Sequence, residues 1–203
     1  KYLKAHLRKS SPRLVLTPSI EKILKAKIKS DAIVKNYYAA IKLNADQILS
    51  MPLLTRQMEG RRLLGVSREM LDRMNILSMV YRIEKDPVLV KRIDDEVKAV
   101  CNFSDWNPSH YLDVAEMTLA VAIALDWVGE ALPKATIDLA KTSLIEKGIK
   151  PSYPQNEIPG WVNGTNNWNQ VCNGGMIAAS IIIADRDPEL AAKTISRSLA
   201  GMP

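Results

Sequence analysis

Two short segments of this sequence gather the side chains best suited to binding a polar ligand. One is residues 102–113, NFSDWNPSHYLD, and the other is residues 160–175, GWVNGTNNWNQVCNGG. Aromatic rings stack on the apolar faces of sugars, and amide side chains both donate and accept hydrogen bonds. Buried amides without partners destabilise a fold, so four asparagines between positions 163 and 169 favour a carbohydrate site over packing. The alternative is a structural turn, because asparagine and glycine are typical of turns.

Individual residues in these segments suggest separate roles. His110, one of two histidines in the chain, either contacts substrate and moves a proton or binds backbone at a helix start. Three acids near it, Asp105, Asp113 and Glu116, either orient His110, bind sugar hydroxyls or simply belong to a first helical turn. Trp127 lies in an apolar stretch and is expected in the core. The residues expected to bind substrate are Trp106, Asn107, Tyr111, Trp161, Trp168, Asn169 and Gln170.

The elements that position these segments are all predicted to be helices. Thr-Pro and Asp-Pro pairs, at residues 17–18, 86–87 and 187–188, are typical helix starts. A break is expected at residues 51–52 and a long loop at 148–165. The helices predicted from apolar spacing span residues 18–30, 31–49, 67–84, 87–100, 111–128, 134–147, 168–185 and 188 onward.

Helices that are apolar on every side alternate along the chain with amphipathic ones. The pattern predicts an all-α fold, an incomplete α/α toroid of antiparallel helical hairpins with inner and outer helix layers. We expect one domain over residues 1–203, with N-terminal helices at 1–50 and the toroid hairpins at 51–203. The starts of inner helices share one rim of a toroid, so the two polar segments are expected to meet there.

Composition excludes several classes of partner. A hydrophobic content of 47% and charged content of 25% are ordinary for a globular domain, and no apolar run is long enough to span a membrane. The net charge of +6 comes from residues 1–30, which hold nine Lys or Arg and one acid, so a solvated face is favoured over nucleic-acid binding. Cys101 and Cys172 lack metal-ligand spacing and are expected to be buried thiols, with a disulfide left open. No metal or other cofactor is expected.

Residues 105–117, DWNPSHYLDVAEM, and 165–176, TNNWNQVCNGGM, resemble the heparinase II/III-like family of polysaccharide lyases. SPRLVLT at residues 11–17 is similar to the family's entry to its catalytic region. The resemblance implies a periplasmic or secreted bacterial enzyme that acts on an acidic polysaccharide. It also implies that the downstream part of the toroid and a β-sheet domain are absent from this chain, which would then be inactive alone.

The chemistry that the resemblance implies is β-elimination at a uronic acid. An amide neutralises the substrate carboxylate so that the C5 proton can leave, and a Tyr or His moves that proton. By similarity Asn167 is the expected neutraliser and Asn166 the second choice, with His110 as a further catalytic candidate. Trp168 stands where related lyases often have His, which suggests stacking there, and the family's Tyr would lie beyond Pro203.

Two other functions fit the same residues. An α/α-barrel glycoside hydrolase would use a carboxylate pair drawn from Asp105, Asp113 and Glu116. A toroid that binds carbohydrate without cleaving it would keep the tryptophans and amides, and Trp168 in place of His slightly favours it. A protein-binding solenoid is a weaker option, because it has no need of this Trp/Asn rim.

Overall fold

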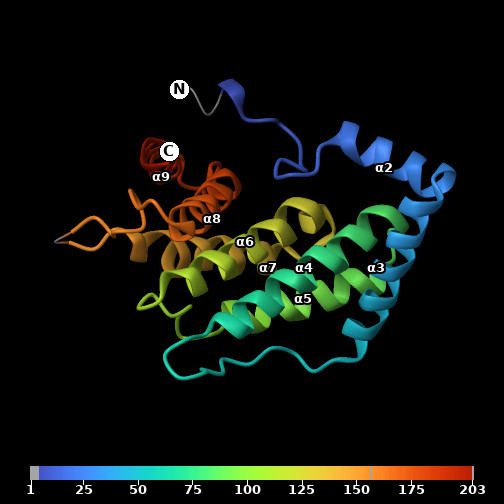
Figure 1. The fold of residues 1–203 in the computed structure, drawn as a ribbon, viewed down its shortest axis with the longest axis horizontal. Helices are drawn as coiled ribbons and strands as arrows, with labels where there is room; N and C mark the ends of the chain where they lie inside the picture. Colours follow the sequence, from blue (N-terminus) through green and yellow to red (C-terminus); the bar gives the residue numbers. More distant parts are fainter. Residues whose placement is uncertain (1–4, 156, 203) are drawn as a thin grey trace.

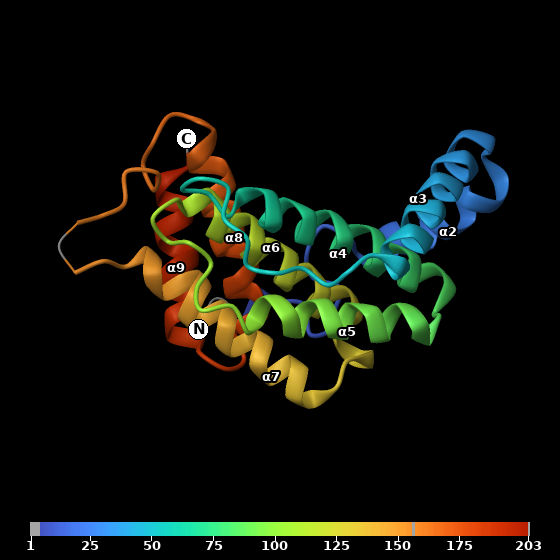
Figure 2. The same ribbon diagram turned by 90° about the horizontal axis from the view of Figure 1, so that it is seen from below.

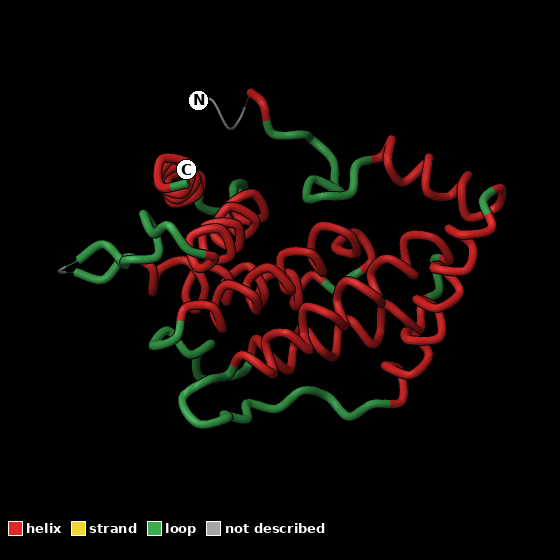
Figure 3. The backbone as a smooth tube through the Cα atoms, viewed as in Figure 1, coloured by secondary structure: helices red, strands yellow, loops and turns green. Residues whose placement is uncertain are grey.

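The computed structural model describes residues 5–155 and 157–202, and within them the chain forms helices and loops with no strand (Figure 3). The all-α class predicted from the sequence is therefore confirmed. The main helices are α2 (Pro18–Ser30), α3 (Ala32–Ser50), α4 (Leu64–Glu84), α5 (Pro87–Cys101), α6 (Tyr111–Val128), α7 (Lys134–Ser143), α8 (Asn167–Ile183) and α9 (Pro188–Gly201).

Short polar side chains begin most of these helices. The Thr17 hydroxyl accepts from the Ile20 amide, and the Asp86 and Asp187 carboxylates cap α5 and α9 in the same manner, each followed by proline. Side-chain oxygens at this position satisfy amides that have no partner within the helix. The three helix starts predicted from Thr-Pro and Asp-Pro pairs are confirmed.

Helices α4, α6 and α8 form one layer in which α6 packs between the other two (Figures 1 and 2). Their directions agree. Leu63, before α4, bonds to Asp113 at the start of α6, and Arg82, near the end of α4, bonds to Trp127 at the end of α6. Every residue of α6 is buried except Glu116 and Leu119, as expected for an inner helix. Helix α6 approaches α8 closely at Gly175, because this residue has no side chain to separate the two helices.

Each inner helix is followed by a helix that returns along it: α5 packs on α4 and on α7, and α9 packs on α8 (Figure 2). Helix α5 buries Ile93 and Val97 and exposes Lys91, which is the amphipathic pattern predicted for an outer helix. Helix α7 continues as a wide π-helical segment, Leu144–Ile149, and a 3-10 turn, Lys150–Ser152, so the following loop is shorter than predicted. The packing of each inner helix against the helix that follows it is observed, and the α/α toroid with its inner and outer layers remains a prediction.

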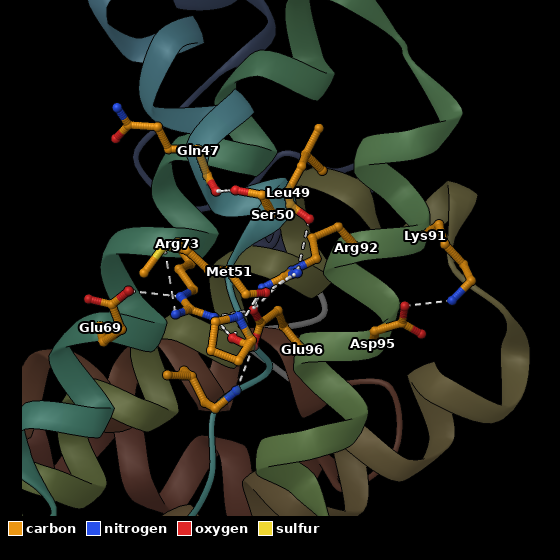
Figure 4. A network of polar contacts seen from close by, with 12 residues as sticks. Gln47, Leu49, Ser50, Met51, Glu69, Arg73, Lys91, Arg92, Asp95 and Glu96 are labelled. Atoms are coloured by element: carbon orange, nitrogen blue, oxygen red, sulfur yellow. Dashed lines mark hydrogen bonds and ion pairs between the residues drawn. The ribbon is translucent and has the colours of Figure 1, made fainter.

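Helices α2 and α3 project at the end of the molecule opposite α8 and α9 (Figures 1 and 2). A polar cluster fixes their connection to the body, because Arg92 donates to the Leu49 and Met51 carbonyls and to the buried Glu96 carboxylate (Figure 4). Within the described residues no helix is long and apolar enough to cross a bilayer. The predicted absence of a membrane-spanning helix is confirmed to that extent.

Candidate functional site

The loops that precede α4, α6 and α8 meet at one end of the inner layer, because Leu63 bonds to Asp113 and His110 contacts Trp168. We call this end the rim; it comprises residues 51–63, 102–113 and 160–170. The sequence predicted that the second and third of these segments would meet there. Contacts between His110 and Trp168, one from each segment, confirm it.

A histidine–carboxylate pair lies at the centre of the rim. His110 Nδ1 is 2.5 Å from Asp113 Oδ1, one turn later at the start of α6. The Asp113 side chain is fully buried, whereas the His110 side chain keeps 17% of its surface exposed. An imidazole that is hydrogen-bonded to a buried carboxylate and is itself partly exposed is suited to accept or donate a proton.

The Asp113 carboxylate has further partners from two loops. Its Oδ2 accepts from the Leu63 amide at 2.6 Å and from Asn107 Nδ2 at 2.7 Å. Asn107 Nδ2 also donates to the Arg61 carbonyl, and the Ser109 hydroxyl donates to Asn107 Oδ1. Asn107 therefore holds the rim together from within, and at 5% exposure it is not the substrate contact predicted from the sequence.

Trp168 borders the histidine. Its ring lies edge-to-face with His110, with centroids 4.9 Å apart and planes at 78°, and it is only partly buried. Asn167 and Gln170, on either side of it in α8, are exposed, whereas the Asn166 side chain accepts from the Trp168 amide and caps the helix. Asn167, Trp168, Gln170 and His110 are thus predicted site residues that the structure leaves available to a ligand, and Asn166 is exposed as well, with its Oδ1 engaged in the cap.

Four other predicted substrate contacts lie inside the protein and are corrected here. Trp106 is fully buried and its indole donates to the Val100 carbonyl, so it is a core residue. Asn169 is 1% exposed and donates to the Trp161, Val162 and Gly201 carbonyls. Tyr111 and Trp161 are buried and stacked on each other, 4.7 Å apart, and the Tyr111 hydroxyl donates to the Gly148 carbonyl. Trp127 is buried, as predicted.

The buried tyrosine and tryptophan give the rim its rigidity. The guanidinium of Arg197, on α9, lies over the Trp161 ring at 5.6 Å and over the Tyr153 ring at 3.9 Å. Burial lowers the pKa of Arg197, and the nearby tyrosines oppose that effect. These cation–π contacts hold Tyr153 and Trp161 against α9, and Trp161 also stacks on Tyr111, so that the following Asn/Trp segment starts from a fixed point.

Arginines on the first rim segment and on the first turns of α4 lie near the site, and the sequence analysis missed them. Arg68 Nε lies 3.1 Å from Glu116 Oε2, which joins α4 to α6 just below the histidine, and the Arg68 side chain is 62% exposed. Arg61 and Arg62 are exposed, and within the described residues no hydrogen bond or ion pair of their side chains is present. The rule that places inner-helix starts at one rim applies equally to α4 and could have found them.

The remaining candidates from the sequence have structural roles. Asp105 pairs with Arg56 at 2.7 Å; burial alone would raise the pKa of Asp105, but hydrogen bonds from Arg56 and the Asn107 amide bring it below its ordinary value. Cys101 and Cys172 are buried free thiols, as expected. Among the described residues, no cluster of His, Cys, Asp or Glu is arranged to hold a metal ion.

A cavity of about 240 Å³ lies at the other end of the inner layer, lined by Arg8, Arg13, Ala184 and Pro188 among others. It is far from the histidine in the fold, since it opens where α8 ends, and its arginine Arg13 is occupied by backbone carbonyls. The rim, with its exposed imidazole and amides, is the better candidate site. Compared with protein-family models and with curated proteins, the sequence gives no match.

Proposed function

We propose that the rim binds an acidic polysaccharide and cleaves it by β-elimination at a uronic acid, as the resemblance to heparinase II/III-like lyases implies. The observation that carries the proposal is the arrangement of the His110–Asp113 pair beside Trp168, at the end of α8 where Asn167 is exposed. The same resemblance places the whole enzyme in the periplasm or outside the cell.

The reaction needs three functions that these residues supply. The Asn167 amide donates hydrogen bonds to the substrate carboxylate, which stabilises the negative charge that builds up when C5 loses its proton. His110 Nε2 accepts that proton. The electron pair of the C5–H bond then forms the C4–C5 double bond, the C4–O bond breaks, and the departing oxygen takes a proton from the imidazolium.

The surrounding residues fit an extended anionic substrate. Trp168 offers a partly exposed ring next to the histidine, on which a sugar can stack. Gln170 adds an exposed amide, and the exposed Arg61 and Arg62 supply positive charge for neighbouring acidic sugars. Guanidinium groups match carboxylate and sulfate oxygens in geometry as well as in charge.

The acids near the rim favour a lyase over a hydrolase. A glycoside hydrolase needs two carboxyl groups that both reach the substrate. Asp113 is buried, accepts two hydrogen bonds and contacts His110, Asp105 is paired with Arg56, and Glu116 is paired with Arg68. All three carboxylates are engaged in hydrogen bonds or ion pairs within the protein. The amides and the imidazole are therefore the groups that can act on a substrate.

The test is to mix the whole protein with a panel of uronate polysaccharides and record near-ultraviolet absorbance, which the unsaturated product of β-elimination raises. Asn167→Ala and His110→Gln should lose the signal. Asn44→Ala, which removes another exposed asparagine far away on α3, should retain it. New reducing ends without absorbance would establish a hydrolase instead, and binding without either product would establish a carbohydrate-binding protein.

A further inference from the structure

The two oxygens of the Asp113 carboxylate have different hydrogen-bond partners. Oδ2 receives two N–H groups, from the Leu63 backbone and from Asn107 Nδ2, and neither of these donors can act as an acceptor. Oδ1 faces His110 Nδ1 at 2.5 Å. Because both of these donors bond to Oδ2, Oδ1 is the oxygen that remains to accept a hydrogen bond from an imidazole N–H.

We infer that Asp113 is a positioning residue that holds His110 as the Nδ1–H tautomer, with the Nε2 lone pair directed to the rim. The catalytic use of that lone pair rests on the proposed function. The tautomer is a property of the protein without substrate. A neutral imidazole carries one proton on its two nitrogens, so fixing that proton on Nδ1 makes Nε2 an acceptor.

Asn107 makes the arrangement rigid. Its backbone has a left-handed φ of 61°, a conformation that asparagine adopts more easily than most residues. Its Nδ2 faces two acceptors, the Arg61 carbonyl and Asp113 Oδ2, while its Oδ1 receives the Ser109 hydroxyl. The orientation of the amide is therefore dictated by its neighbours, and so is the donor that it presents to Asp113.

These contacts link the histidine to a distant part of the sequence. Leu63 and Arg61 belong to the loop before α4, and both are bonded to the Asn107–Asp113 pair. The imidazole thus keeps its orientation before any ligand arrives. Preorganisation of this kind raises the rate of a reaction, because no group has to be reoriented in the transition state.

The inference is tested by labelling the imidazole nitrogens with ¹⁵N and recording long-range ¹H–¹⁵N correlations of the neutral form. The chain has two histidines, and a His6→Gln variant assigns the spectrum to His110. We expect His110 to carry its proton on Nδ1 in the unaltered protein. Asp113→Asn should shift the proton toward Nε2, whereas Asp105→Asn, a change on the same loop, should leave the tautomer as it was.

A proton on Nε2 in the unaltered protein, or an unchanged tautomer in Asp113→Asn, would overturn the inference. If Asp113→Asn does not fold, the spectrum of the unaltered protein still decides the question. Where the whole protein shows lyase activity, Asp113→Asn should also lower kcat by about 10²-fold with little change in KM. Absence of lyase activity would remove the proposed function and leave the tautomer result intact.

Discussion

Arg73 donates from Nη1 to Glu96 Oε1 over 2.5 Å, and neither side chain is exposed beyond 4%. Figure 4 shows Arg92 approaching the same carboxylate, whose Oε1 lies 2.6 Å from Arg92 Nη2. The two arginines also donate to the Pro52 and Met51 carbonyls. The cluster therefore joins α4, α5 and the loop that leads to the rim.

Removing the carboxylate should destabilise the fold strongly. In Glu96→Gln two largely buried guanidinium groups lose this counter-charge, which leaves Arg73 with the exposed Glu69 and Arg92 with backbone carbonyls. Breaking such a buried pair costs about 3–5 kcal/mol. Urea unfolding measures the loss. Asp95→Asn, which breaks the exposed Lys91–Asp95 pair of the same helix, should change the free energy of unfolding by no more than about 0.5 kcal/mol. Equal losses in both variants would contradict this account.

The adjacent glycines of α8 should respond in opposite ways to alanine. A Cβ on Gly175 would lie 2.7 Å from the Ala115 carbonyl oxygen, whereas a Cβ on Gly174 meets nothing within 4 Å. Gly175→Ala should cost about 1–3 kcal/mol, because α6 and α8 must move apart. Gly174→Ala should stabilise by about 0.5–1 kcal/mol, since alanine favours a helix. Thermal unfolding of both variants checks the pair, and a stable Gly175→Ala protein would show that the helices can adjust.

Asn166 and Asn167 should separate stability from function. The Asn166 side chain caps α8, and its replacement by alanine should cost about 1 kcal/mol. The exposed Asn167 has no such role, so Asn167→Ala should unfold at the same urea concentration as the unaltered protein while losing product formation. Lost activity with lost stability in Asn167→Ala would point to a structural role instead.

Alkaline pH should destabilise the protein in part through Cys101. Burial raises the pKa of its thiol to about 11 from an ordinary value of 9.0, with Ser143 and Lys147 opposing the effect. As the pH rises, the thiol ionises in the unfolded chain before it ionises in the folded protein. The contribution of the neutral thiol to the free energy of unfolding is therefore complete below about pH 9 and is lost as the pH rises to about 11. The loss is about 3 kcal/mol at most.

Urea unfolding across this pH range, for the unaltered protein and for Cys101→Ala, measures the effect. Other groups titrate in the same range in both proteins, so the difference between the two curves isolates the thiol. The variant should start less stable and lose less stability as the pH rises. Parallel curves would mean that the thiol does not contribute.

The fold was accessible from the sequence because its signals are local. Proline after Thr17, Asp86 and Asp187 marks helix starts, and apolar spacing distinguishes the buried α6 from the amphipathic α5. The helix predicted over residues 134–147 covers α7 and most of the wide segment that follows it. Its last turn, at Gly148 and Ile149, was missed, because that turn has no local signature and depends on close packing against Thr118.

The site was accessible only in part. Residue type and position placed His110 and Trp168 at one rim, but type alone does not distinguish an exposed ring from a buried one. The Trp106 indole donates a hydrogen bond to the Val100 carbonyl, six residues earlier, and the Asn169 amide donates to three backbone carbonyls. Such partners are set by tertiary structure, and so sequence reasoning assigned these residues to the surface.

The common direction of α4, α6 and α8 has an electrostatic effect that no single side chain produces. Peptide dipoles add along a helix and leave about half a positive charge at its N-terminal end. All three such ends, at Leu64, Tyr111 and Asn167, face the rim. An anion that approaches the rim therefore meets an attractive field from the backbone itself, which would survive replacement of every rim arginine and would weaken as salt is added.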